Sequence, residues 1–347
     1  NTWKETADIR EPEPTGFDLF SYSIALAVTS DSYVILAGAP GYDAIDIEYS
    51  YGLVEVFSRS RAGGQWHREA PILGGEDERF FGQSIAIDGE HLAISSVVPG
   101  VVLPSLVPAA VHFYEGPPNA WTEIQVERSS TVLAYALYGF SLALHGDTIA
   151  IGYPALVGAF TTPGSIWIYE LRDGVWEFSQ KLGREVTARD ETLEDVFGSQ
   201  VLLEDRRLLT FGYREETVAA NGYLFERGAD GRFRQTHAFE PPTRSELASF
   251  ASGLALAGDQ VLIGSPDYDG AVGAVRVYTL AELGQACSAN GACASGHCID
   301  GVCCDSACND GDLNDCLACS VAMGASQDGT CTPVAALHVC RPARSDC

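Results

Sequence analysis

The sequence predicts an all-β fold: a β-propeller of four-stranded blades with five repeats visible, followed by a small, irregular, disulfide-rich C-terminal module. Three observations predict it. A strand–turn–strand pattern recurs at intervals of roughly 55 to 60 residues. Each copy continues into a third strand that ends on an aromatic residue and, in four copies, a fourth that has one near its start. All 11 cysteines lie in residues 287–347.

The first two strands of each repeat are clearest in the stretch FGQSIAIDGEHLAISS, residues 81–96. Apolar and small residues alternate in it, and Asp88-Gly89 supplies the positive φ of a tight hairpin turn. Closely similar stretches begin at Phe20, Phe81, Tyr138, Phe197 and Phe250. Each is predicted to form an antiparallel hairpin.

The third and fourth strands carry aromatic landmarks. Those ending the third strands are Phe57, Tyr114, Tyr169, Phe225 and Tyr278. Those near the start of the fourth strands are Trp66, Trp121, Trp176 and Phe233. A β-sandwich with coincidental spacing is the alternative, but four landmarks recurring in the same order favour propeller blades.

The two ends of the repeat region complement each other. The fifth copy lacks a fourth strand, and Trp3 fits the fourth-strand pattern. Pairing of the strand at Trp3 with the strand at Tyr278 would close a five-bladed ring and remove an exposed sheet edge. Missing upstream sequence would instead make the ring larger. Because the chain begins with Asn1, either a leader has been removed or the sequence is a fragment.

The charge balance narrows the range of partners. With 47 acidic against 21 basic residues, the formal charge is −26. This field repels phosphate backbones and anionic lipid, so the sequence predicts no nucleic-acid partner. The most apolar run, residues 97–113, is interrupted by Pro99, Pro104 and Pro108, so no membrane-spanning segment is predicted.

The repeats resemble FG-GAP repeats, the blades of the integrin α-subunit propeller and of many secreted bacterial proteins. The FG pair is present at Phe81-Gly82 and Phe197-Gly198, and the GAP triplet at residues 38–40, with variants at residues 152–154 and 264–266. The resemblance covers residues 1 to about 284 and implies the fold; it does not fix the activity.

Calcium is where the sequence departs from this family. Integrin-type blades often hold calcium in a D-x-D/N-x-D-G loop between the first two strands, but these turns are too short here to surround an ion. No cofactor is therefore expected. Asp267 and Asp269 are the remaining candidate calcium ligands, and solvated loop carboxylates are the favoured reading.

Binding residues are expected on the loops after strands two and four, which share one end of each blade. The loop of residues 97–109 is strongly apolar, and it either contacts a ligand or packs on the next blade. The candidate ligand-binding residues are Tyr42, Asp43, Asp46, Val101, Leu103, Leu106, Phe160, Asp267 and Tyr268.

No catalytic residues are predicted. The seven histidines show no metal-ligand spacing, and no nucleophile elbow or phosphate-binding loop occurs. His112 falls within a third strand, where a histidine is more often packed or at the surface than a ligand. Propeller enzymes draw residues from several blades, so the sequence favours a non-enzyme without excluding a hydrolase.

The cysteine-rich segment has few apolar residues, so cross-links are expected to replace a core. The predicted disulfide cysteines are Cys287, Cys293, Cys298, Cys303, Cys304, Cys308, Cys316, Cys319, Cys331 and Cys340. Their pairing cannot be read from spacing. A zinc site at Cys316 and Cys319 is the alternative, although no second matching pair is present. Eleven is an odd number, so one cysteine is left over: it pairs either with another molecule or with a partner beyond Cys347, and continuation of the module beyond Cys347 is the favoured prediction.

The run SGHCIDGVCCDSAC resembles cysteine-rich segments that follow repeat domains in secreted and surface proteins of some Gram-negative soil bacteria. We therefore expect two domains, residues 1–284 and 285–347, in a secreted or cell-surface bacterial protein. The expected function is recognition or adhesion, with an extracellular protein or a polysaccharide bound through the propeller loops. The alternatives are a propeller hydrolase or lyase acting on polysaccharide, and a purely structural surface module.

Overall fold

The fold is an all-β propeller of five blades with almost no helix. The computed structural model describes residues 4–5, 7–11, 18–42, 51–75, 78–97, 108–118, 120–129, 137–154, 164–183, 196–214, 219–228, 230–241, 250–266, 268, 272–287, 293, 295, 297–308 and 317–334. Each blade is an antiparallel sheet whose strands are paired in chain order, which confirms the prediction from the repeat.

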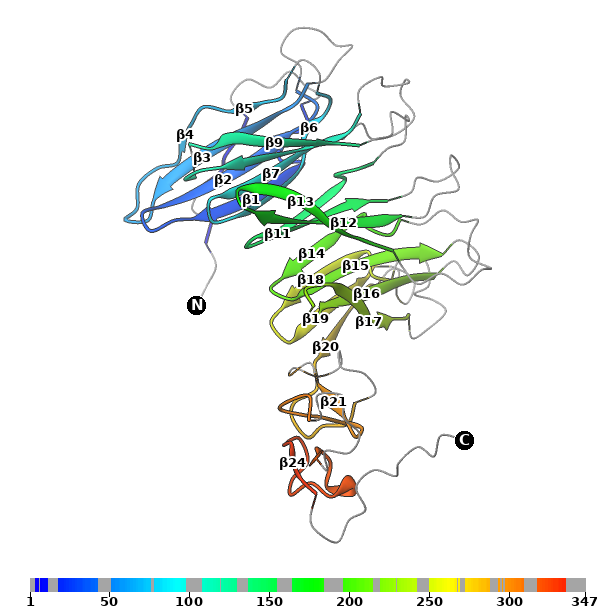
Figure 1. Ribbon diagram of the computed structural model, residues 1–347. Helices are drawn as coiled ribbons and strands as arrows, with labels where there is room; N and C mark the ends of the chain where they lie inside the picture. Colours follow the sequence, from blue (N-terminus) through cyan, green and yellow to red (C-terminus); the bar gives the residue numbers. More distant parts are fainter. Residues whose placement is uncertain are drawn as a thin grey trace. The chain divides into compact units, whose positions relative to one another are not determined.

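The first three blades follow one another from blue to green in Figure 1. Blade 1 contains β1 (Ser23–Val28), β2 (Ser32–Ala39), β3 (Leu53–Ser60), β4 (His67–Arg68) and β5 (Ile72–Leu73). Blade 2 contains β6 (Phe81–Asp88), β7 (His91–Ser96), β8 (Ala110–Glu115) and β9 (Thr122–Arg128). Blade 3 contains β10 (Ser141–His145), β11 (Thr148–Tyr153), β12 (Ser165–Arg172) and β13 (Val175–Leu182). In blade 1 the fourth strand is divided, and Pro71, which has no N–H to donate, lies in the interruption.

Two further blades follow. Blade 4 contains β14 (Val201–Glu204), β15 (Arg207–Arg214), β16 (Ala219–Arg227) and β17 (Phe233–Phe239). Blade 5 contains β18 (Gly253–Ala257), β19 (Gln260–Ser265) and β20 (Ala274–Thr279), three strands in the described residues. The chain forms two compact units, Asn1–Asp205 with Thr210–Val218, and Arg206–Leu209 with Ala219–Cys347.

Glycines of the repeat motif make the contact between neighbouring blades. A Cβ atom on Gly38 would lie 2.1 Å from the carbonyl oxygen of Gly82, and one on Gly152 would lie 1.9 Å from that of Gly198. Gly82 and Gly198 also have φ angles of 90° and 88°, which favour glycine. A serine side chain donates to each of these carbonyls, Ser23 to Gly82 and Ser141 to Gly198. The repeat therefore encodes a close approach of backbone to backbone.

Apolar side chains fill the space between neighbouring blades. Between blades 1 and 2 the buried set includes Val54, Val56, Phe81 and Ile94. Between blades 2 and 3 the core is built on aromatic rings, and Phe113 stacks on Trp176 with ring centroids 5.2 Å apart. Six of the landmark aromatics are thus buried, namely Phe57, Tyr114, Tyr169, Trp176, Phe225 and Phe233, whereas Trp66, Trp121 and Tyr278 are only partly buried.

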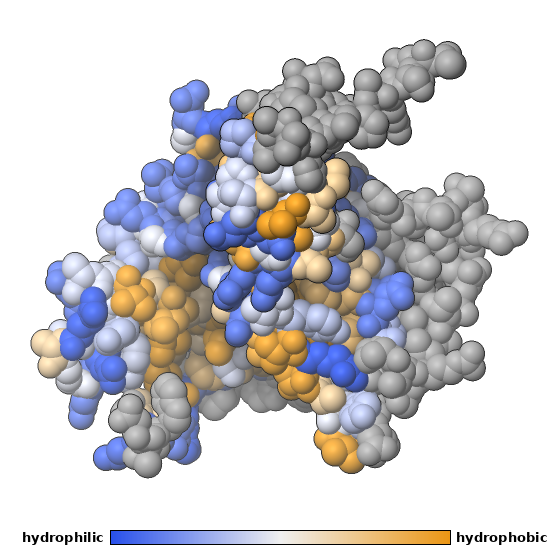
Figure 2. All heavy atoms as spheres, turned by 90° about the horizontal axis from the view of Figure 1, so that it is seen from below, coloured by the Kyte–Doolittle hydropathy of each residue, from blue (hydrophilic) through white to orange (hydrophobic). Residues whose placement is uncertain are grey.

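The first strand of blade 1 carries exposed apolar side chains. Ile24 and Leu26 of β1 are 71% and 57% exposed, whereas Ile85, at the equivalent place in blade 2, is 8% exposed. Figure 2 shows apolar patches of this kind among hydrophilic side chains. Trp3 lies outside the described residues, so its pairing with the strand at Tyr278 stays a prediction.

Disulfides hold the C-terminal segment together, as expected. The pairs are Cys287–Cys298, Cys293–Cys303, Cys304–Cys319 and Cys308–Cys331. The short segments between them are β21 (Cys298–Ile299), β22 (Val302–Cys303), β23 (Leu317–Ala318), η3 (Val321–Met323) and β24 (Thr332–Pro333). Cys316 and Cys340 lie outside the described residues.

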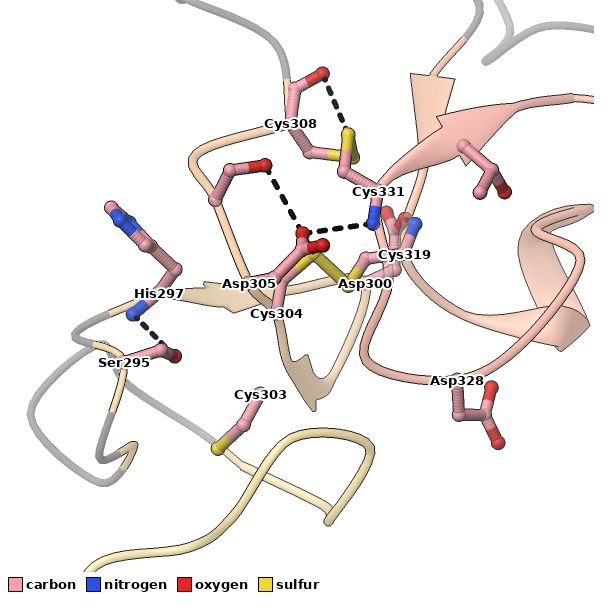
Figure 3. The surroundings of a disulfide bond; sticks show 12 residues. Ser295, His297, Asp300, Cys303, Cys304, Asp305, Cys308, Cys319, Asp328 and Cys331 are labelled. Carbon is pink, nitrogen blue, oxygen red and sulfur yellow. Dashed lines mark hydrogen bonds between the residues drawn. A yellow bond between two sulfur atoms is a disulfide. The ribbon is translucent and has the colours of Figure 1, made fainter.

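Carboxylates replace part of the missing core in this segment (Figure 3). Asp300 accepts a hydrogen bond from the backbone N–H of Cys319, and Asp305 accepts one from that of Cys331. Cys319, a candidate zinc ligand, is oxidised in its pair with Cys304 and so offers no thiolate to a metal. The described sulfur atoms that cluster within 4.8 Å, those of Cys287, Cys293 and Cys303, are likewise all in disulfides.

Candidate functional site

The two ends of each blade differ in the length of their connections. At one end, here named the turn end, the first two strands are joined by short turns such as residues 89–90 and 146–147. At the other, the loop end, the connections after the second strand include residues 40–52, 97–109 and 154–164. Long connections on a rigid sheet are where binding residues usually lie.

Two of the predicted binding residues are described, and both follow a second strand at the loop end. The backbone of Tyr42 bonds to Ala39 and Gly52, which fixes the chain where it leaves β2. The ring of Tyr268 lies 5.7 Å from the guanidinium of Arg276. The other predicted residues, with the candidate calcium ligand Asp269, lie outside the described residues: Asp43, Asp46, Val101, Leu103, Leu106, Phe160 and Asp267.

Sequence reasoning missed a buried ionic network at the loop end of blade 2. It is centred on Glu78, in the connection before β6, and on His112, the third residue of β8. These residues are 2% and 4% exposed. His112 Nε2 lies 3.2 Å from Glu78 Oε2, and the ring edge of Phe81 packs against the imidazole. The sequence predicted a packed or a surface histidine at this position, and it gave no indication of the carboxylate partner.

The network reaches the surface through two half-exposed side chains. Arg128, the last residue of β9, donates to Glu78 Oε1 at 2.7 Å, and Glu123 Oε2 lies 2.9 Å from His112 Nδ1. Ser96, the last residue of β7, donates to Glu78 Oε2. Glu78 therefore touches the ends of two strands from which loop-end connections leave.

Charge and burial act in opposite directions on these groups. Burial raises the pKa of Glu78, but His112, Ser96 and Arg128 outweigh it and lower that pKa to about 2. Burial lowers the pKa of His112, whereas the carboxylates of Glu78 and Glu123 raise it above its ordinary value of 6.5. Both shifts favour the charged form of each group, an imidazolium at His112 and a carboxylate at Glu78.

This arrangement suits support rather than proton transfer. A general base needs a free ring nitrogen facing a substrate. Here one nitrogen of His112 faces Glu78 and the other faces Glu123. The network can hold a charge in a fixed place, and its contacts link the segment that carries Glu78 to β7, β8 and β9.

Blade 1 has a related ion pair at the equivalent strand position. Glu55, like His112, lies two residues before the landmark aromatic of its third strand and is 2% exposed. Arg68 donates two hydrogen bonds to it, at 2.6 and 2.7 Å. Glu11 lies close to this pair, and burial, Asp18 and Glu55 raise its pKa to about 7.

Replacing Glu11 is expected to stabilise the protein above neutral pH. A raised carboxyl pKa means that stability falls as pH rises from about 4.5 through 7, because the native state then loses a proton it holds more tightly than the unfolded chain. Glu11→Gln should raise the free energy of unfolding by about 1 kcal/mol at pH 8, allowing for solvent screening, and by nothing at pH 4.5. Urea unfolding at both pH values measures this, with exposed Glu5→Gln as control; an equal change at both would contradict it.

A cleft of about 510 Å³ lies at the opposite, turn end of blades 1 and 2. Its walls combine apolar residues with two carboxylates, and the lining residues are Leu26, Ala27, Val28, Thr29, Ile87, Asp88, Gly89, Glu90, Pro117 and Pro118. Asp88 is already engaged, since its carboxylate accepts a hydrogen bond from the backbone N–H of Gly146. None of the predicted binding residues lies in this cleft.

Comparisons with known proteins leave the family open. No family model matches the chain, so FG-GAP membership stays a resemblance, and no curated protein matches it. Among solved structures, it is similar to a prolyl endopeptidase with 13% identity and a TM-score of 0.42, over 74% of this chain and 33% of that one.

Two further solved structures are similar at the same level. A Trypanosoma rangeli sialidase shows 10% identity and a TM-score of 0.39, over 71% of this chain and 42% of that one. An α-L-arabinofuranosidase from Lactobacillus brevis shows 12% identity and a TM-score of 0.38, over 75% of this chain and 90% of that one. The chain thus spans less than half of the first two relatives. With TM-scores below 0.5, these likenesses carry no argument about activity.

Proposed function

We propose that the chain is an extracytoplasmic recognition module that binds a protein or a polysaccharide through the loop end of its blades. The observation that carries this is the contrast between the two blade ends, with short turns at one and long connections at the other. Anchored connections of unequal length can form a surface of specific shape without disturbing the sheets. The candidate contact residues are those that the sequence places on these connections.

Two further features support this proposal. All eight cysteines in the described part of the chain are paired, which fits an oxidising compartment and a protease-resistant spacer after the propeller. The resemblance to FG-GAP repeats fits a surface module. Among the described residues, no helix is long and apolar enough to cross a bilayer.

The alternative function is that of a polysaccharide hydrolase, so the experiment measures binding and hydrolysis on the same substrates. The full chain would be immobilised and tested by interferometry against purified polysaccharides and extracellular matrix proteins, and release of reducing ends would be measured on the same polysaccharides. Binding without reducing-end release is the expected result. Release would overturn the proposal in favour of catalysis, and binding to nothing in either panel would overturn it in favour of a structural module.

Variants at both ends of the blades test the location of the proposed binding site. Val101→Asp with Leu103→Asp is expected to weaken binding at least about tenfold, as is Asp43→Asn with Asp46→Asn, which leaves apolar packing untouched. Val28→Asp, in the turn-end cleft, is the matched control and should bind as the parent chain does. Loss of binding in the control alone would move the site to the cleft.

A further inference from the structure

The network in blade 2 joins segments that leave the sheet at the loop end. Glu78 belongs to the connection between β5 and β6, Ser96 directly precedes residues 97–109, and Arg128 directly precedes the connection from β9 to β10. One carboxylate therefore holds three connections together. The backbone N–H of Glu78 also bonds to Gly75, which fixes the turn that carries the carboxylate.

His112 is the buried histidine of the network and lies between its two glutamates. The titratable and charged groups facing it are Glu78 from the connection before β6 and Glu123 from β9. Arg128 acts on it only through Glu78, and Tyr114 of β8 lies beside Glu123. On its other side, Phe81 and the apolar core between blades 1 and 2 exclude water. A buried carboxylate in such surroundings requires a compensating positive charge.

We propose that His112 is a positioning residue that, in its imidazolium form, holds the connection carrying Glu78 against the strands flanking residues 97–109, and that this contact weakens as pH rises and the imidazole is deprotonated. When the imidazole loses its proton, Ser96 and Arg128 still hold Glu78, so the connection loosens without unfolding of the blade. The functional meaning of this inference rests on the proposed function, because the segments that His112 positions adjoin those proposed to bind a ligand.

The test is amide hydrogen exchange of the full chain at pH 6 and pH 9, corrected for the intrinsic rate and read on peptides covering residues 74–80. The expected result is about tenfold faster corrected exchange at pH 9 in the parent chain. The midpoint should follow the imidazole titration of His112, recorded by NMR. His91→Gln, which removes the other histidine of blade 2, is the matched control and should leave the profile unchanged.

Two variants distinguish positioning from general support. His112→Gln should exchange equally fast at both pH values, and Glu123→Gln should move the midpoint to lower pH while keeping the blade folded, since Glu123 is half-exposed. If His112→Gln fails to fold, Glu123→Gln still decides the question. The proposal would be overturned if the corrected exchange rate of the parent chain were the same at both pH values. It would also be overturned if the pH midpoint of exchange were unchanged in Glu123→Gln. No ligand enters this measurement, so its outcome is independent of the binding test above.

Discussion

Gly152→Ala is expected to lower the free energy of unfolding by about 3 kcal/mol, because it forces two blades apart. The new methyl group would lie 1.9 Å from the carbonyl oxygen of Gly198 and 2.3 Å from Ser141 Oγ. The first of these neighbours is backbone at the start of the next blade and cannot rotate away. Ser141 would also lose its hydrogen bond to that same carbonyl. The measurement is urea unfolding followed by the fluorescence of buried Trp176.

Two further glycines make this prediction specific. Gly38→Ala, which meets the carbonyl of Gly82 between blades 1 and 2, should cost a similar amount. Gly183→Ala should be close to neutral, because in the described part of the chain no atom beyond its two chain neighbours lies within 4 Å of the added methyl group. If Gly152→Ala were as mild as Gly183→Ala, the contact between blades 3 and 4 would not be as the structure has it.

Local pattern is sufficient to predict most of the fold. The turn Gly89–Glu90 joins β6 and β7 within one residue of the expected position, with Gly89 at a φ of 60°. The landmark aromatics Tyr114 and Tyr169 lie on third strands and are 7% and 5% exposed, as their recurrence indicates. These features depend on residues close together in the chain, so alternation and turn residues are enough to locate them.

The candidate site could be predicted only in part, because its residues meet through tertiary structure. Glu78 and His112 are in different segments, and Glu78 is one of three successive acids on a loop, a pattern that does not indicate a partner. A signal was nevertheless present. Glu55, His112 and Arg276 are ionisable residues two positions before the landmark aromatic of their third strands, inside segments predicted to pack in a blade. Burial of a charge demands a partner, so this position could have prompted a search for one.

The repeat motif itself became interpretable only with the structure. The sequence shows that glycines recur, but the reason is a contact between successive repeats. In the second repeat, where the GAP triplet is eroded, Ser95 lies near Gly139, and a Cβ on that glycine would lie 2.9 Å from the Cβ of Ser95. Ser84 there accepts a hydrogen bond from the backbone N–H of Leu142, which keeps blades 2 and 3 in register by another route. Loss of the motif in one repeat therefore leaves the contact between blades intact.

Glu78→Gln is expected to lower the free energy of unfolding by a similar amount, because it removes the central charge of the network in blade 2. The change keeps the shape of the side chain but leaves His112 and Arg128 facing a neutral amide. Removing one partner of a buried ion pair typically costs about 3 to 5 kcal/mol. The lowered pKa of Glu78, about 2 against 4.5, corresponds to a cost of the same order, about 3 kcal/mol.

The difference in the free energy of unfolding between the parent chain and Glu78→Gln should shrink as pH falls. Because the pKa of Glu78 is lowered in the folded state, its contribution is complete above about pH 4.5 and is lost as pH falls toward 2. The parent chain should therefore lose about 3 kcal/mol across that window that the Glu78→Gln variant does not lose, and the two stabilities should converge near pH 2. Glu123→Gln is the control and should cost less than about 1 kcal/mol at pH 6, because that side chain is 45% exposed. A constant difference between the parent and Glu78→Gln from pH 6 to pH 2 would mean that the carboxylate is not ionised in the folded protein, and the charged network would then not exist.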